Sequence, residues 1–401
     1  MKKVLILSYY FPPNAGAHVQ RIAKFVKYLP QFGFEPVILT NRNKLSRQDR
    51  GLLDDVGNCK IYYASDPGKL MPGTVRKFFF KYLQPDKLKF WKTFAVPKAL
   101  KIIKNENISL LFTSIPPHSV SCLASKVAKR SKLPLVIDMR DEWITFPLFT
   151  KKKFASLNKD IYYKNISACS TVTTVNKTLK KRISEDLKSN NTDKPVHTVY
   201  NGFDADDIPQ NINYESSQQL KICYNGRFKH ISDPTFFFSV LNKMIKNSVL
   251  NINEIRLIFT DDISNQKWIS KYPLLYKITE FTGYLSLKDS YKLIAKCDIG
   301  LILLTNYAKS TALPLKMFDY AALDKPILAV VDKEDELTDL IKNYQASEIL
   351  FTDQEKNASD KILDFFNRVR ANKTIPERSF KKEFDRKVQT DQLSKIFKTL
   401  L

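Results

Sequence analysis

Residues 313–330 read LPLKMFDYAALDKPILAV, and they carry the clearest structural signal in the chain. Pro314 suits the first turn of a helix, where no backbone hydrogen bond is lost, and the apolar residues after it recur at helical spacing. Pro326 ends the helix, because the residue before a proline avoids the helical region. The run Ile327–Val331 is apolar throughout, as expected for a strand that is covered on both faces of a parallel sheet.

The same stretch places a cation and an acid, Lys316 and Asp319, on the short helix between a loop and a strand. Free amides at a helix start can bind phosphate, and a carboxylate can accept hydrogen bonds from two neighbouring ribose hydroxyls. This combination suggests a site for a sugar nucleotide. The alternative is an amphipathic helix that only packs on a sheet, with Asp319 stabilised by the helix dipole.

Short apolar runs alternate with helical patterns along the chain, which predicts parallel sheets with helices on both faces. In the first half, strands are expected at residues 4–8, 36–40, 60–64, 110–114, 134–138, 170–175 and 197–201. In the second half, they are expected at residues 220–225, 255–260, 278–284, 298–304, 326–331 and 348–352. The predicted fold class is α/β, with two doubly wound Rossmann-like domains that face a central cleft.

The length of 401 residues is too great for a single core and fits two domains. The strand–helix pattern restarts after a polar stretch that ends at residue 219. We therefore expect an N-terminal domain at residues 1–205, a linker at residues 206–219 and a second domain at residues 220–379. A helical segment at residues 380–401 is expected to cross back to the first domain.

Composition excludes several classes of protein. Glycine is scarce at 10 residues, and no Gly-rich phosphate loop of the Walker type is present. The five cysteines are widely spaced and odd in number, which favours a reducing, cytoplasmic compartment over a disulfide framework. The run Val4–Leu7 is too short for a signal peptide and is interpreted as a first strand. No run of about 18 apolar residues predicts a membrane-spanning helix.

The net charge of +24 is concentrated in one half of the chain. Residues 1–200 hold 36 Lys and Arg against 14 Asp and Glu, whereas residues 201–401 hold 29 against 27. Such a field indicates an anionic partner, namely a phospholipid surface, a lipid-linked diphosphate or nucleic acid. A general solubility effect would instead spread the charge over both halves.

A basic and aromatic segment within residues 76–92 is typical of contact with an acidic membrane or an acceptor, because aromatic rings settle at headgroup level while cations meet anionic lipid. The residues expected to make this contact are Arg76, Lys77, Phe79, Lys81 and Trp91. The alternative is a core helix with a solvated basic face.

Several segments besides residues 313–330 resemble glycosyltransferase family 4. They are the loop 8–17, the segment 137–143, the Asn-Gly-Phe-Asp at residues 201–204 and the Thr-Gly-Tyr-Leu at residues 282–285. The resemblance extends from the first strand to the last quarter of the chain and implies the two-domain GT-B architecture. The chain departs from the family pattern where two glutamates are usual, since Thr311 and Asp319 occupy those positions.

The resemblance implies a retaining glycosyltransferase that moves a sugar from a nucleotide-diphosphate sugar to a glycan or lipid-linked acceptor. It also implies a role in cell-surface polysaccharide biosynthesis. The expected location is the cytoplasm, peripherally on the inner face of the cytoplasmic membrane. No metal or other cofactor is expected, because fixed cations can stabilise the leaving diphosphate. Two alternatives remain: a sugar-nucleotide epimerase or non-catalytic relative of the same fold, and a nucleic-acid-binding protein, although no nucleic acid partner is expected.

The resemblance also assigns residues to roles. The implied donor-binding residues are Gly16, Arg227, Gly283, Tyr284, Pro314, Lys316 and Asp319. The implied catalytic residues are His118, Asp141, Arg227 and Lys229. His118 follows two prolines at a strand end, where we expect it outside the core. For Asp141 the alternative is a local ion pair with Arg140 that only shapes the loop.

Overall fold

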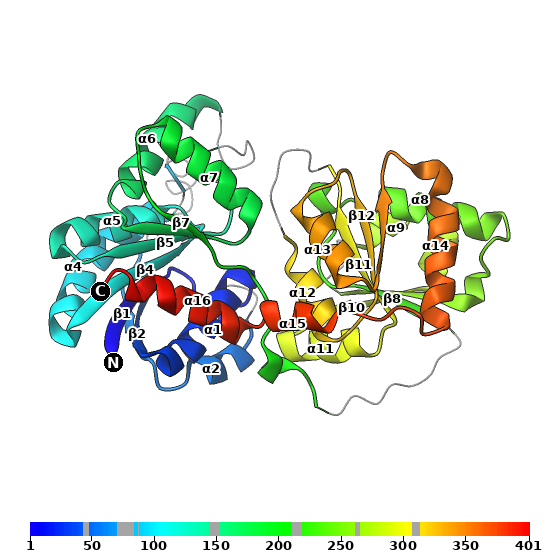
Figure 1. Cartoon of the computed structure of the whole chain (residues 1–401), viewed down its shortest axis with the longest axis horizontal. Coiled ribbons are helices and arrows are strands. Elements are labelled where there is room, and N and C mark those ends of the chain that lie inside the picture. Colours follow the sequence, from blue (N-terminus) through cyan, green and yellow to red (C-terminus); the bar gives the residue numbers. More distant parts are fainter. Residues whose placement is uncertain are drawn as a thin grey trace. The chain divides into compact units, whose positions relative to one another are not determined.

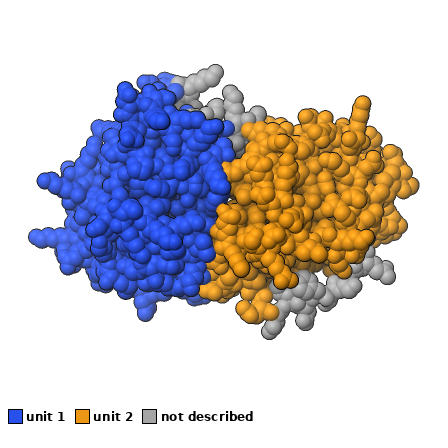
Figure 2. All heavy atoms as spheres, viewed as in Figure 1, with its two compact units in different colours: residues 1–201, 386–401 blue, residues 202–385 orange. Residues whose placement is uncertain are grey.

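The computed structural model describes residues 1–42, 48–69, 84–86, 88–144, 152–210, 219–260, 265–306 and 313–401. The chain divides into two compact units, which Figure 2 colours separately. Unit 1 holds residues 1–201 and 386–401, and unit 2 holds residues 202–385. The first boundary thus lies at residue 201 rather than 205, and the chain returns to unit 1 at Arg386 rather than at residue 380.

Unit 1 is built on seven parallel strands in the order β3-β2-β1-β4-β5-β6-β7 (Figure 1). The strands are β1 Lys2–Leu7, β2 Phe34–Thr40, β3 Lys60–Tyr63, β4 Ile108–Ile115, β5 Leu135–Met139, β6 Thr171–Thr174 and β7 Val196–Thr198. The order reverses between β1 and β4. In open parallel sheets, ligands bind at the carboxyl edge beside such a reversal.

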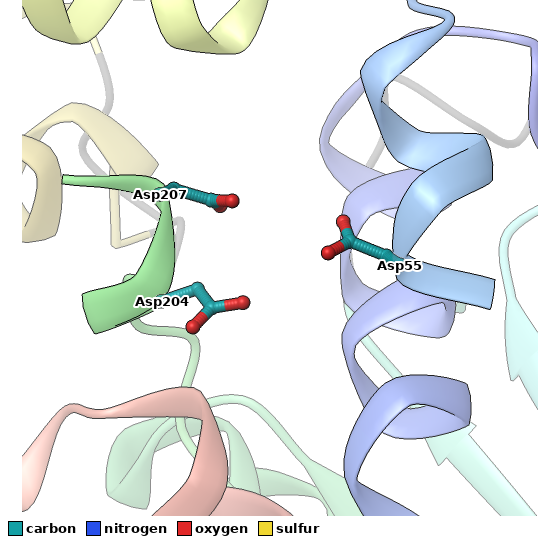
Figure 3. A group of neighbouring side chains, drawn as sticks. All are labelled: Asp55, Asp204 and Asp207. Carbon is teal, nitrogen blue, oxygen red and sulfur yellow. The ribbon is translucent and has the colours of Figure 1, made fainter. Parts of the chain in front are cut away.

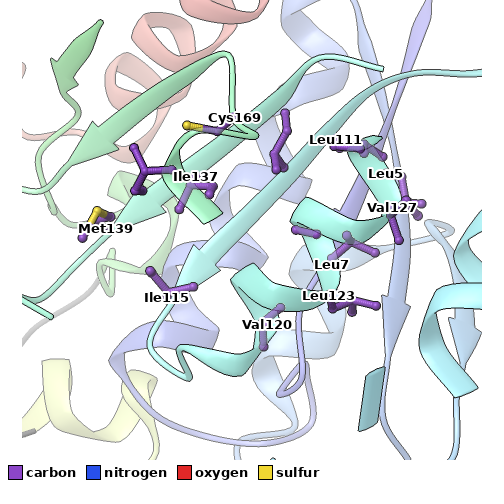
Figure 4. Packing of buried hydrophobic residues seen from close by; sticks show 14 of the residues in the cluster. Leu5, Leu7, Leu111, Ile115, Val120, Leu123, Val127, Ile137, Met139 and Cys169 are labelled. Carbon is purple, nitrogen blue, oxygen red and sulfur yellow. The ribbon is translucent and has the colours of Figure 1, made fainter. Parts of the chain in front are cut away.

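Helices cover both faces of this sheet. They are α1 Ala17–Tyr28, α2 Gly51–Val56, α4 Lys92–Glu106, α5 Ser119–Ser131, α6 Ala155–Ile166, α7 Lys177–Ser189 and α16 Arg386–Lys398. On one face, α5 points Val120, Leu123 and Val127 toward Leu7 and Leu111 of the strands (Figure 4). All five side chains are buried, so this face forms an aliphatic core.

The C-terminal helix α16 belongs to the core of unit 1 on the other face of the sheet. The ring of Phe397 packs edge-on against Phe34 and Phe112, with centroids 5.4 and 5.7 Å apart. Phe25 of α1 meets the same Phe112 at 5.9 Å. Such aromatic pairs contribute about 0.5–1.5 kcal/mol beyond the burial of their area. The helix is therefore an integral part of unit 1.

Unit 2 repeats the architecture with six parallel strands in the order β10-β9-β8-β11-β12-β13. The strands are β8 Leu220–Tyr224, β9 Ile255–Thr260, β10 Thr279–Gly283, β11 Ile299–Leu304, β12 Ile327–Val331 and β13 Ser347–Phe351. The helices are α8 Thr235–Lys246, α9 Gln266–Ile269, α10 Pro273–Lys277, α11 Leu287–Ala295, α12 Leu315–Ala322, α13 Glu336–Tyr344, α14 Glu355–Arg370 and α15 Arg378–Glu383. The α/β class with two doubly wound domains is confirmed, and every expected strand forms.

Part of the expected basic and aromatic segment cannot be placed, since Arg76, Lys77, Phe79 and Lys81 lie outside the described residues, as does Thr311. Trp91 is described, and its expected position at a membrane or acceptor surface is wrong. Its side chain is 1% exposed, and its indole nitrogen donates to the carbonyl of Ala64 at 3.1 Å. Within the described parts of the chain, no helix combines the length and apolar character needed to cross a membrane.

Candidate active site

The loop after β8 is held rigid by a buried amide. Asn265 is fully buried, and its Nδ2 donates to the carbonyls of Gly226 and Thr260 at 3.0 Å each. Its Oδ1 accepts from the backbone N–H of Phe228 at 2.9 Å. The carbonyl of Arg227 accepts from the hydroxyl of Tyr224 at 3.2 Å, while the Arg227 side chain is exposed. The loop thus presents a guanidinium to solvent from a fixed backbone.

Helix α12 is anchored over the point where the strand order of unit 2 reverses. The ring of Tyr320 is buried against Gly300, where an added Cβ would lie 2.4 Å from the ring. Its hydroxyl accepts from the backbone N–H of Asn225 at 3.1 Å and donates to the carbonyl of Leu301 at 3.2 Å. Because β8 and β11 are neighbours at this reversal, the start of α12 lies where ligands bind in such sheets.

Lys316 lies against an aromatic face at this position. Its Nζ is 3.4 Å from the ring centroid of Tyr224 and would lie 3.4 Å from a Cβ added at Gly226. Gly226 has a φ of +135°, a conformation that L side chains rarely adopt. Burial lowers the pKa of Lys316 to about 7, Lys229 acts in the same direction, and the carboxylate of Asp319 opposes both. The Lys316 ammonium group therefore lies next to the backbone of the loop at Gly226.

Asp319, the expected ribose ligand, is half-buried on the next turn of α12. Its Oδ1 accepts a hydrogen bond from the hydroxyl of Tyr291 on α11 at 3.0 Å. Tyr291 is 2% exposed, so it can fix the orientation of the acid. The sequence did not single out Tyr291, because its spacing in α11 is that of an ordinary core residue.

The remaining expected donor residues of unit 2 lie at loop ends. Pro314 precedes the first residue of α12 as its cap, with φ −62° and ψ 128°, instead of lying in the first helical turn. Gly283 ends β10 with a φ of +76°, and the next residue, Tyr284, is 44% exposed. Lys229 is exposed after the loop that carries Arg227.

In unit 1 the loop after β1 uses the freedom of one glycine. Gly16 has a φ of +125°, and an added Cβ would lie 3.2 Å from the ring of His18. Its carbonyl accepts from the N–H groups of Val19 and Gln20 at 2.9 and 3.0 Å, which starts α1. Burial, with a smaller effect of Arg140, lowers the pKa of His18 to about 4, so its imidazole is neutral near pH 7.

His118 was expected outside the core, and this expectation is wrong. Its side chain is 5% exposed and stacks flat on Trp143, with centroids 4.3 Å apart and planes 12° apart. Burial, aided by Arg140, lowers the pKa of His118 to about 3. The physical reason is that Trp143, itself 2% exposed, provides an aromatic wall for the imidazole. A neutral His118 does not act as a cation near pH 7.

Next to Arg140 and Asp141 in the sequence, the acid Asp138 pairs with an arginine from a distant part of the chain. Asp138 is fully buried and accepts from Nε and Nη2 of Arg21 at 2.9 and 2.8 Å. Burial alone would raise the pKa of Asp138, but this guanidinium holds it below its usual range. Arg140 instead donates to Ser114 Oγ at 3.0 Å. Burial raises the pKa of the half-buried Asp141, and Arg140 opposes that shift.

Figure 3 labels three carboxylates, Asp55 on α2 of unit 1 and the pair Asp204 and Asp207 in unit 2. Within unit 1, Asp55 pairs with the buried Lys24 at 2.7 Å. Within unit 2, Asp204 Oδ1 accepts from the backbone N–H of Asp206 at 3.1 Å and caps a short 3₁₀ helix. These local bonds explain Asp55 and Asp204 within their own units, and we assign no metal to the three acids.

Comparisons with known proteins also point to glycosyltransferases. Residues 19–207 match the family model described as Glycosyltransferase Family 4. A search of curated protein sequences gave no match. Sucrose-phosphate synthase from Thermosynechococcus elongatus is a similar solved structure, with a TM-score of 0.68 and 10% identity over 100% of this chain and 99% of that one.

Two further solved structures cover the whole of both chains. HepE from Anabaena, in complex with UDP and glucose, gives a TM-score of 0.66 at 13% identity. The apo form of the lipopolysaccharide outer core galactosyltransferase WaaB gives 0.63 at 16% identity. At these identities the likeness concerns the fold, and the fold of this chain is the GT-B fold of glycosyltransferases.

Proposed function

We propose that this chain is a retaining glycosyltransferase that uses a nucleotide-diphosphate sugar as donor. The observation that carries the proposal is the meeting of Lys316, Gly226 and Asp319 at the strand-order reversal of unit 2. A parallel sheet binds ligands at that point, and a cation beside an open backbone loop suits a diphosphate. HepE, of the same fold, has been solved with UDP and glucose.

In this proposal Lys316 and Arg227 bind the diphosphate, Asp319 binds the ribose, and Gly283 and Tyr284 lie near the base. The acceptor hydroxyl attacks the anomeric carbon as the bond from that carbon to the diphosphate breaks. The hydroxyl proton passes to the departing phosphate oxygen. Positive charge at Lys316 and Arg227 stabilises the diphosphate more in the transition state than in the ground state, which is the source of the rate increase.

The acceptor is assigned to unit 1 because of charge. Unit 1 contains 40 Lys and Arg against 15 Asp and Glu, whereas unit 2 contains 25 against 26. An excess of this size favours a glycan or lipid-linked acceptor with anionic groups at an acidic membrane surface. We propose that the enzyme works in cell-surface polysaccharide biosynthesis, peripherally on the inner face of the cytoplasmic membrane.

The first experiment is a thermal-shift screen across nucleotide sugars, since a ligand that binds only the folded state raises the melting temperature. The donor so identified is then incubated with candidate glycan acceptors, and the products are analysed by mass spectrometry and NMR. A glycoside with the donor's anomeric configuration supports a retaining transferase. Inversion refutes the retaining assignment, and conversion of the donor to its epimer without transfer supports the epimerase alternative.

The role of Arg227 is tested by Arg227→Ala, with Arg256→Ala as the matched control. Arg256 is an arginine of unit 2 whose side chain is 41% exposed, and it lies at the start of β9 and thus at the amino edge of the sheet. Charge-assisted hydrogen bonds contribute roughly 1.5–3 kcal/mol each, so Arg227→Ala should lower kcat/KM by about 10- to 100-fold. Melting temperatures should stay unchanged in both variants. Equal activity of the two variants would remove Arg227 from the site.

A further inference from the structure

A hollow of about 320 Å³ opens at the carboxyl edge of the sheet in unit 1. It lies beside the loop after β1 and at the ends of β2 and β3, with Asn14, Thr40, Asn41, Arg42 and Tyr63 among its lining residues. Parallel sheets bind ligands at this edge. None of the residues assigned above to donor binding or catalysis lines the hollow, so the proposed donor chemistry does not account for it.

Three polar side chains form a rigid floor. Asn14, Thr40 and Asn41 are 3%, 1% and 5% exposed, which is unusual for such residues below a simple surface dent. Thr40 Oγ1 donates to the carbonyl of Tyr9 at 3.2 Å, and Asn41 Nδ2 donates to that of Ala64 at 3.1 Å. The Nδ2 of Asn14 donates to the carbonyl three residues earlier at 2.9 Å. These bonds connect the loops after three strands, so the hollow is preorganised for binding.

A single cation, Arg42, lies beside this floor. Arg42 is the one charged side chain among the described residues that line the hollow. Its guanidinium carbon lies 5.1 Å from the ring centroid of Tyr63, whose side chain is 41% exposed. An aromatic ring holds a guanidinium in a defined plane without consuming its hydrogen-bond donors on an acid. The planar donors of Arg42 then suit a phosphate or a carboxylate.

We propose that this hollow binds an anionic sugar of the acceptor, with its phosphate or carboxylate on Arg42. The floor at Asn14 and Asn41 holds the surrounding loops in place, and the exposed ring of Tyr63 suits the apolar edge of a sugar ring. The proposal rests on the proposed function, because only a transferase needs an acceptor site in unit 1. It extends that function by naming an acidic sugar as the acceptor's recognised part.

The experiment measures binding of glucose 6-phosphate, glucuronate, glucose and inorganic phosphate to the full chain by calorimetry. We expect glucose 6-phosphate or glucuronate to bind at least tenfold more tightly than glucose and inorganic phosphate, and the preferred anion identifies the acidic group. Arg42→Ala should weaken that binding at least tenfold, and Tyr63→Ala should weaken it severalfold. The matched control is Arg130→Ala, which removes an exposed arginine at the far end of α5.

Three results would overturn the proposal: unchanged binding in Arg42→Ala, an equal loss in Arg130→Ala, or binding of inorganic phosphate as tight as that of the sugar anions. The thermal shift with the donor sugar nucleotide is measured in every variant and should not change. Binding of the acidic sugar without any donor response would refute the transferase function while leaving the sugar site intact. A thermal shift with the donor but no binding of the acidic sugars would support the transferase function and refute the acidic-sugar site.

Discussion

Lys316 should make donor binding depend on pH. Its Nζ is held 3.4 Å from the ring centroid of Tyr224, and burial lowers its pKa to about 7. With that pKa, the side chain is about 90% charged at pH 6 and about 10% charged at pH 8. If the donor diphosphate requires the charged form, affinity should fall about tenfold between these pH values, or about 1.4 kcal/mol.

Calorimetric titration with the donor sugar nucleotide can measure this fall. At pH 8 the complex should also take up close to one proton, which is detected by comparing buffers that differ in ionisation enthalpy. Lys316→Arg serves as the control, because a guanidinium stays charged throughout this range. Its affinity should be flat from pH 6 to pH 8. A flat profile for the unaltered protein, or an equal slope in Lys316→Arg, would show that Lys316 does not control donor binding through its charge.

The same group has an opposite effect on the ligand-free protein. The folded-state pKa of about 7 lies below the usual 10.5, so the unfolded chain binds more protons between these values. The free energy of unfolding should therefore rise as pH increases from about 7. Lys316→Met should remove this contribution, and urea titrations at pH 7 and pH 9 can measure the difference between the two proteins.

Three other predictions concern stability and membrane contact. Arg21→Met should destabilise unit 1 by about 3–5 kcal/mol, because it leaves the carboxylate of Asp138 buried without its cation, and urea denaturation would measure this loss. Gly300→Ala should lower the melting temperature and weaken donor binding together, since its Cβ would lie 2.4 Å from the ring of Tyr320; retention of both would contradict the anchoring of α12. Replacing the lysines of residues 76–92 by glutamine should weaken cosedimentation with anionic vesicles by about 1 kcal/mol per charge, and unchanged partitioning would remove the membrane proposal.

Sequence patterns predicted those features that depend on local chemistry. The run 255–260 is a strand with these bounds, and Ile327–Val331 is fully buried, because a central parallel strand must be apolar on both faces. Periodicity can be recognised from the sequence alone, because it depends only on residues that are close in the chain.

Contacts between side chains that are far apart in the sequence could not be predicted from such patterns. Asp138 lies only two residues from Arg140 in the sequence, but its cation is Arg21, which is 117 residues away. The buried amide of Asn265 holds the loop before Phe228 through bonds that no spacing rule predicts. His118 follows β4 and stacks on Trp143, which follows the neighbouring strand β5. Such contacts depend on topology, which local propensity does not determine.

The return of the chain to unit 1 at Arg386 has a consequence for biosynthesis. A ribosome synthesises every residue of unit 2 before it reaches α16. Unit 2 can thus acquire its fold during translation, while the older unit 1 still lacks Phe397 and must wait with its sheet partly uncovered. Nascent chains stalled before and after residue 386 should therefore differ in how strongly chaperones engage the N-terminal half.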